Sequence, residues 1–136
     1  MSHCNLRQLR AGDIMKKTIQ WATQSENLRV AGQRMAENGI RALLVAGEDP
    51  SDLPGILTSK DIVNLLCTQD VAVLDQLQVR DVMTRPAICV PRKTNLLDCL
   101  NLMRMSGVRR LPVLDDTNVV GVLSMSDVFA HMLREC

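Results

Sequence analysis

The chain has 136 residues, of which 46% are hydrophobic and 23% charged, proportions that are ordinary for a soluble globular protein. Its length predicts one compact unit with a substantial core and is short for two ordinary domains. Sixteen basic and fifteen acidic residues leave a net charge of +1, which argues against binding to nucleic acid or to a membrane surface. With one Phe, one Trp and no Tyr, the sequence also lacks an aromatic platform for stacking single-stranded bases.

No segment is apolar over the length that spans a bilayer, and residues 1–5 carry no export-signal pattern. The five cysteines are odd in number, widely spaced and form no Cys-x-x-Cys pair. They therefore predict neither a disulfide framework nor a zinc site. A cytoplasmic protein with reduced thiols is the expectation.

The predicted elements form two sets with the same order. The first set is a helical turn at 13–15, a strand at 19–22, an amphipathic helix between a Ser25 cap and Gly39, strands at 42–46 and 55–58, and a helix over 62–66. The second is a helical turn at 81–83, a strand at 87–90, a helix between a Thr94 cap and Gly107, strands at 110–114 and 119–124, and a helix over 128–132. The order β-α-β-β-α predicts an α+β fold. Because each set is too small to bury both faces of its sheet, the two are expected to share one core.

The two sets of elements are copies of one another. Identical residues recur at an offset of 68 from Leu6 to Val45, and at an offset of 66 from Gly55 to Asp61. The single change of offset falls in the turn between the last two strands of each set, where a difference in length is tolerated. The chain is therefore a tandem duplication, with repeats at 6–68 and 74–133.

In each repeat a buried strand runs directly into a helix start. Thr58 and Asp61 have the spacing of an N-terminal capping box, and Ser124 and Asp127 repeat it. A helix N-terminus presents unpaired backbone N–H groups and a partial positive charge, which suits an anion. One such motif alone is most simply a helix cap that needs no ligand. Its recurrence in register favours a binding role.

Three motifs in a fixed order give the chain a family resemblance. They are Asp-[Ile/Val]-Met at 13–15 and 81–83, Gly-[Ile/Val]-Arg-x-Leu-x-Val at 39–45 and 107–113, and the closing Gly-to-Asp segments at 55–61 and 121–127. Each repeat resembles a cystathionine-β-synthase (CBS) domain, and the pair resembles a Bateman module. The resemblance implies repeats related by a pseudo-two-fold axis, with two clefts between them, in a module that often dimerises further.

Members of this family commonly bind AMP, ADP, ATP or S-adenosylmethionine in the clefts and report the binding to a partner enzyme or transporter. Carried over to this chain, the implied cofactor-binding residues are Thr18, Ile19, Arg41, Thr58, Ser59, Lys60, Asp61, Pro86, Ala87, Arg109, Arg110, Ser124, Ser126 and Asp127. The two aspartates would accept hydrogen bonds from ribose, and the Thr58 and Ser124 hydroxyls would face phosphate. Backbone groups at 18–19 and 86–87 would meet the adenine edge.

The resemblance also implies that basic residues of one repeat serve the cleft of the other. Arg109 and Arg110 would then join Lys60 near Asp61, whereas only Arg41 would join the Asp127 cleft. We therefore expect the first cleft to bind the more highly phosphorylated nucleotide. One departure from the family pattern is Leu44, where the second repeat has the commoner Pro112, and it affects the shape of one cleft wall.

The sequence leaves a second class of function open. A ligand-free dimerisation or scaffold module would instead use an apolar helix face, for which the candidates are Ile62, Leu65, Leu66, Val128 and Met132. No Ser/His/Asp or Cys/His set, glycine-rich phosphate loop or metal cluster can be assembled, so neither catalytic nor metal-binding residues are predicted and the protein is not expected to be an enzyme. The expected partners are an adenosine nucleotide and a second copy of the chain, with no membrane insertion.

Overall fold

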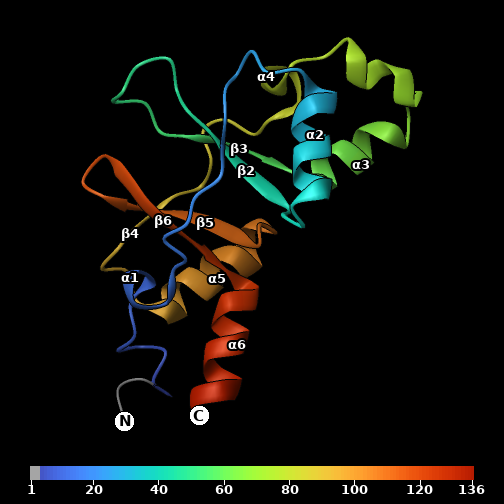
Figure 1. Cartoon of the computed structure of the whole chain (residues 1–136). Helices are drawn as coiled ribbons and strands as arrows, with labels where there is room; N and C mark the ends of the chain where they lie inside the picture. Colours follow the sequence, from blue (N-terminus) through green and yellow to red (C-terminus); the bar gives the residue numbers. More distant parts are fainter. Residues whose placement is uncertain (1–3) are drawn as a thin grey trace. The chain divides into compact units, whose positions relative to one another are not determined.

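The computed structural model describes residues 4–136, which divide into two compact units (Figure 1). The central unit is Gln20–Ala87, and the terminal unit combines the described residues up to Ile19 with Ile88–Cys136. Each unit has its own three-stranded sheet and its own cluster of buried hydrophobic residues. The prediction of a single shared core is therefore wrong, whereas the predicted α+β tandem-repeat fold is confirmed.

In the central unit, three α-helices and one 3₁₀ helix accompany a mixed sheet. Its elements are β1 (Trp21–Ala22), α2 (Leu28–Glu37), β2 (Ala42–Val45), β3 (Gly55–Thr58), α3 (Ser59–Leu66), the 3₁₀ helix η2 (Val71–Asp75) and α4 (Val79–Val82). β2 lies between β1, to which it is parallel, and β3, to which it is antiparallel. The register pairs Ala42 with Thr58, so the start of β2 lies beside the start of α3.

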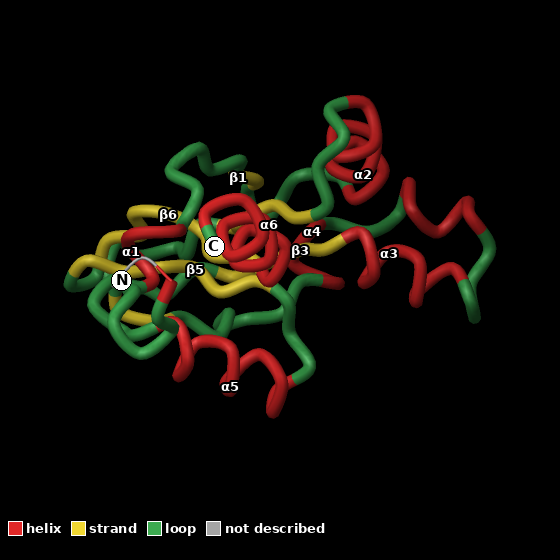
Figure 2. The backbone as a smooth tube through the Cα atoms, turned by 90° about the horizontal axis from the view of Figure 1, so that it is seen from below, coloured by secondary structure: helices red, strands yellow, loops and turns green. Residues whose placement is uncertain are grey.

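The terminal unit has the same plan. Its elements are α1 (Ala11–Ile14), β4 (Val90–Pro91), α5 (Leu96–Ser106), β5 (Arg110–Asp115), β6 (Asn118–Ser124) and α6 (Met125–Glu135). The strand order is β4-β5-β6, and Arg110 pairs with Ser124 as Ala42 pairs with Thr58. The short helix α1 lies beside β6 and α6 (Figure 2).

Each unit is built from parts of both sequence repeats. In the terminal unit, Lys16 from the first repeat exchanges two backbone hydrogen bonds of 2.9 Å with Val122 from the second. In the central unit, Thr84 from the second repeat exchanges the same pair of bonds, also of 2.9 Å, with Ile56 from the first. The segment that begins each repeat thus completes the unit that holds the other repeat's strands.

This exchange explains why both repeats have a glycine at the matching position of the last strand, Gly55 in β3 and Gly121 in β6. A Cβ atom on Gly121 would lie 2.5 Å from the Met15 Sδ and 2.8 Å from the Lys16 carbonyl oxygen. A Cβ on Gly55 would lie 3.1 Å from both the Met83 Sδ and the Thr84 carbonyl oxygen. The crossing segments pass so close to the sheet that a side chain at either position would force them to shift.

The exchange also explains where the first strand of each set begins. The predictions at 19–22 and 87–90 are too early, because only Trp21–Ala22 and Val90–Pro91 pair with a neighbouring strand. The chain passes from one unit to the other between residues 19 and 20 and again between 87 and 88. Residues before these points therefore belong to a different unit and cannot extend β1 or β4.

The predicted helix caps are wrong by one or two residues. The N-caps are Asn27, whose side chain accepts a hydrogen bond from the Val30 N–H, and Asn95, whose side chain accepts one from the Asp98 N–H, and not Ser25 and Thr94. The residues that follow these caps are held by the exchanged segments, since the Leu28 and Leu96 N–H groups donate to the Leu77 and Leu9 carbonyls. The predicted glycines at the helix ends are confirmed, with φ values of 63° at Gly39 and 78° at Gly107.

A disulfide joins Cys4 to Cys136, whose Cα atoms are 5.8 Å apart, so the expectation of no disulfide is wrong. The described start of the chain and the end of α6 lie side by side in the terminal unit (Figure 1). This pairing could not be predicted from the sequence, because the two cysteines are separated by 132 positions. Cysteine usage is therefore no argument for a reducing compartment.

The other three cysteines form no disulfide among the described residues and differ in exposure. Cys67 is exposed, whereas burial raises the pKa of Cys89 and, together with the nearby Asp98 carboxylate, raises the pKa of Cys99 to about 11. Because the thiolate is the reactive form, we expect iodoacetamide at pH 8 to label Cys67 first and Cys99 last. Peptide mass spectrometry over a time course measures the order, and rapid labelling of Cys99 in folded protein would contradict the packing of α5.

Candidate functional site

The start of α3 is a complete capping box. The Asp61 Oδ2 accepts a hydrogen bond of 2.8 Å from the Thr58 N–H, and the Thr58 Oγ1 accepts one of 3.2 Å from the Asp61 N–H. The Ser59 N–H donates to the Arg41 carbonyl at 2.9 Å. The N–H groups of Thr58, Ser59 and Asp61 therefore already have partners, so the anion seat predicted here is narrower than a bare helix N-terminus.

The start of α6 repeats this arrangement. The Asp127 Oδ2 accepts from the Ser124 N–H at 3.3 Å, and the Ser124 Oγ accepts from the Asp127 N–H at 3.0 Å. The Met125 N–H donates to the Arg109 carbonyl at 2.9 Å. Both predicted hydroxyls thus keep their own hydrogen available to donate, for example to a phosphate oxygen.

The helix caps use only one oxygen of each aspartate carboxylate. Capping uses Oδ2 of each carboxylate, and among residues 4–136 the Oδ1 of Asp61 has no hydrogen-bond or ion-pair partner. Both carboxylates are partly buried, at the surface of their units. Helix capping and acceptance of a ligand hydroxyl are therefore compatible at the same side chain.

The exchanged segments bring the predicted adenine-contacting residues to the same units as the aspartates. Thr18 and Ile19 follow Lys16, which bridges to β6, and belong to the unit of Asp127. Pro86 and Ala87 follow Thr84, which bridges to β3, and belong to the unit of Asp61. The Ala87 N–H donates to the Pro54 carbonyl at 2.8 Å, which fixes this segment beside the start of β3.

The remaining predicted residues divide between the units in the same way. The central unit holds Arg41, Ser59 and Lys60, and the terminal unit holds Arg109, Arg110 and Ser126. The Arg41 backbone contacts the start of α3, in its own repeat, and the Arg109 backbone contacts the start of α6. The predicted side-chain pairings of Arg109 and Arg110 with Asp61, and of Arg41 with Asp127, join different units and stay predictions.

One charged residue at the site was missed by sequence reasoning. The Lys16 Nζ lies 3.3 Å from the Asp127 Oδ1, the carboxylate oxygen that takes no part in the capping box. Only the exchange of segments places Lys16 there, so no local pattern could reveal it. The sequence does show that Lys16 and Thr84 occupy the same position of the two repeats, at the offset of 68. This alignment was the only sequence signal that the two sites differ here.

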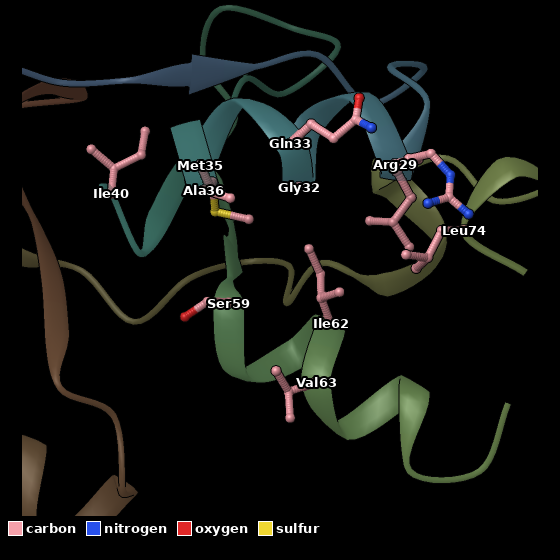
Figure 3. Close-up of a pocket in the computed structure, with 11 residues that line it drawn as sticks. Arg29, Gly32, Gln33, Met35, Ala36, Ile40, Ser59, Ile62, Val63 and Leu74 are labelled. Carbon is pink, nitrogen blue, oxygen red and sulfur yellow. The ribbon is translucent and has the colours of Figure 1, made fainter. Parts of the chain in front are cut away.

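An apolar groove of about 310 Å³ lies between α2 and α3, and Asp61 is not among the residues that line it (Figure 3). Ile62 points from α3 toward Gly32 on α2, and its Cδ1 would be 3.3 Å from a Cβ at that glycine. In the second repeat the position of Gly32 is taken by Leu100, which packs against the core of the terminal unit. Of the predicted site residues, the groove includes Ser59.

Within the described residues 4–136, no helix is both long and apolar enough to cross a membrane. The same residues contain no group of three or more His, Cys, Asp or Glu side chains that could hold a metal ion.

Comparison with known proteins decides the family. The family model described as "CBS domain" matches residues 11–68 and 79–134, which is most of the chain and both repeats. The chain belongs to the CBS domain family. The matched ranges follow the sequence repeats, so each CBS repeat contributes its leading segment to the other compact unit.

The chain is similar to proteins of known sequence and of known structure. The uncharacterized protein MK0525 of Methanopyrus kandleri is 27% identical over 90% of this chain, which spans 62% of that relative's length. The hexameric CBS-CP12 protein from bloom-forming cyanobacteria is 26% identical with a TM-score of 0.80, over 89% of this chain and 66% of that one. The CBS domain pair of MJ0100, solved with 5′-methylthioadenosine and S-adenosyl-L-methionine, has a TM-score of 0.78 at 23% identity, over 93% of this chain and 98% of that one.

Proposed function

We propose that this CBS domain pair is a regulatory module that binds adenosine nucleotides in clefts between its repeats and transmits the binding as a conformational change. The observation that carries the proposal is the duplicated capping-box aspartate, which uses one carboxylate oxygen for the helix cap. The other oxygen has no partner at Asp61 among residues 4–136 and is paired with the exposed Lys16 at Asp127. A ribose offers two vicinal hydroxyls, and a hydrogen bond to a charged acceptor contributes about 1.5–3 kcal/mol. No catalytic activity is part of the proposal.

The surroundings of each aspartate support an adenosine ligand. Thr18–Ile19 belong to the unit that holds Asp127, and Pro86–Ala87 belong to the unit that holds Asp61. MJ0100 demonstrates that a CBS pair of this fold can hold adenosine-containing molecules. At 23% identity the likeness to MJ0100 concerns the fold, so the choice of ligand rests on this chain's own residues.

Isothermal titration of the full chain with AMP, ADP, ATP and S-adenosylmethionine tests the proposal. We expect saturable binding of at least one of the four. A ligand that binds both repeats favours the conformation to which it binds more tightly. Binding should therefore also change the fluorescence of Trp21, which is 40% exposed. Silence from all four ligands would remove the proposal.

The predicted cross-repeat cations give a second test within the same proposal. Arg110→Ala should weaken ATP binding by about tenfold, and Arg41→Ala by less, because the Asp61 cleft is proposed to gather the larger positive charge. Titration of ATP into both variants at constant ionic strength measures the difference. Equal losses in the two variants would show that the clefts do not differ in this way.

Dimerisation or scaffolding is the second candidate function. Of the apolar residues predicted for it from sequence, Val128 is 4% exposed, whereas Ile62, Leu65, Leu66 and Met132 are partly buried against the unit cores. Further candidates are the more exposed apolar side chains on these helices, Val63 on α3 and Phe129 and Leu133 on α6, which are 60%, 66% and 68% exposed. The CBS-CP12 relative is hexameric, which favours assembly as part of the function.

Light scattering during size-exclusion chromatography separates the two candidates. A scaffold predicts that Phe129→Glu lowers the oligomeric state while Asp61→Asn with Asp127→Asn leaves all behaviour unchanged. A sensor predicts that the aspartate variants abolish the nucleotide response.

We propose a cytoplasmic location, a homodimer as the basic assembly and an enzyme or transporter as the regulated partner.

A further inference from the structure

We propose that Lys16 makes the Asp127 site select phosphorylated ligands over uncharged nucleosides. This inference rests on the proposed function and assigns a specificity-determining role to a residue outside the predicted site. Its basis is the ion pair between the Lys16 Nζ and the Asp127 Oδ1, at 3.3 Å. The other carboxylate oxygen is held by the helix cap, so Lys16 occupies the oxygen on which a ribose hydroxyl would bind.

The backbone of Lys16 is fixed while its ammonium group is free to move. Both backbone polar groups bond to Val122 at 2.9 Å, which holds the residue beside β6. The side chain is 74% exposed, whereas that of Asp127 is 12% exposed. The ammonium can therefore leave the carboxylate by side-chain rotation alone, without moving the strand pairing.

The other unit provides a natural comparison. Thr84 occupies the position of Lys16, with the same pair of 2.9 Å backbone bonds to Ile56. Threonine carries no charge, and the Asp61 Oδ1 has no ion-pair partner in the described part of the chain. The two sites thus share this backbone pairing, and they differ in that a cation is paired with the capping carboxylate at Asp127.

This difference acts on ligand choice through competition. An uncharged nucleoside must displace the ammonium from Asp127 and gives it nothing in return. A nucleotide also displaces it, but its phosphate is a new partner for the released ammonium. Because the pair is solvent-exposed on the lysine side, the competition is modest, about two- to fivefold in affinity. Lys16 also adds a second cation to the site for which sequence reasoning found only Arg41.

The test compares adenosine with AMP in variants that keep one site. In an Asp61→Asn background, Lys16→Thr should tighten adenosine binding by about two- to fivefold and weaken AMP binding, so the AMP preference falls. In an Asp127→Asn background, Thr84→Lys should raise the AMP preference of the Asp61 site. Lys17→Thr removes the same charge one residue away, from an exposed position, and should leave the preference unchanged.

The outcomes distinguish the proposed role of Lys16 from the proposed nucleotide binding on which it rests. Titration calorimetry at two salt concentrations gives both affinities, and the preference due to Lys16 should shrink as salt is added. If Lys16→Thr leaves the ratio of AMP to adenosine affinity unchanged, or if Lys17→Thr changes it equally, the inference is overturned while nucleotide binding stands. If wild-type protein binds neither ligand, the proposed function fails as well.

Discussion

Removing the Cys4–Cys136 disulfide is expected to lower the free energy of unfolding by about 2–4 kcal/mol. The bond closes a loop of almost the whole chain, since the cysteines are 132 positions apart, and such a loop strongly restricts the unfolded state. It also holds the segment that supplies Leu9, Ala11 and Met15 to the terminal core. Thermal unfolding followed by circular dichroism should show a midpoint about 10 °C lower in reductant.

Two variants make this measurement specific. Cys4→Ser should reproduce the effect of reductant and then be insensitive to it, whereas Cys67→Ser changes an exposed thiol and should match the wild type. Identical midpoints with and without reductant would show that the bond does not form in solution. Alkylation of Cys4 and Cys136 in a fresh lysate reports the redox state in the cell and tests the proposed cytoplasmic location.

Asp61→Asn and Asp127→Asn should each weaken nucleotide binding at their own site by about 10- to 100-fold. The estimate corresponds to one charge-assisted hydrogen bond, about 1.5–3 kcal/mol. Asparagine keeps an oxygen that can accept the capping hydrogen bond from Thr58 or Ser124, so the helix start should survive. Titration calorimetry with AMP measures the loss, and circular dichroism checks the fold.

The chain offers matched controls for these two variants. Asp81 and Asp13 accept the same type of capping hydrogen bond, from the Gln78 N–H at 2.8 Å and the Arg10 N–H at 2.9 Å, and start the short helices α4 and α1. Asp81→Asn and Asp13→Asn should therefore affect stability as the site variants do, without an effect on binding. If the control variants weaken binding as much as the site variants, the aspartates act through the fold and not through the ligand.

Most of the fold could be predicted from local patterns that occur in both repeats. Paired positions such as Gly39 and Gly107, which end the helices in the left-handed conformation, are visible in one sequence because only glycine adopts that backbone without strain. The capping boxes at Thr58 and Ser124 were predictable for the same reason, since their partners lie three residues away. Patterns that close within one turn of helix are readable without a structure.

Features that depend on contacts distant in sequence were not predictable. Asn27 and Asn95 cap their helices, and exchanged segments hold the residues that follow. Local N-cap preference does not separate Asn27 from Ser25, although it does favour Asn95 over Thr94. The Lys16–Asp127 ion pair spans 111 positions (127 minus 16) and follows from the same exchange. The expectation of one core failed because the exchange gives each unit enough apolar residues for its own.

Native mass spectrometry of the full chain with AMP tests the central claim most directly, because it counts bound nucleotides per chain. The claim is that the two capping-box aspartates each anchor one adenosine ligand. We predict up to two AMP molecules on the wild type, one on either Asp61→Asn or Asp127→Asn, and none on the double variant at the same concentration. A double variant that binds as many nucleotides as the wild type would contradict the claim.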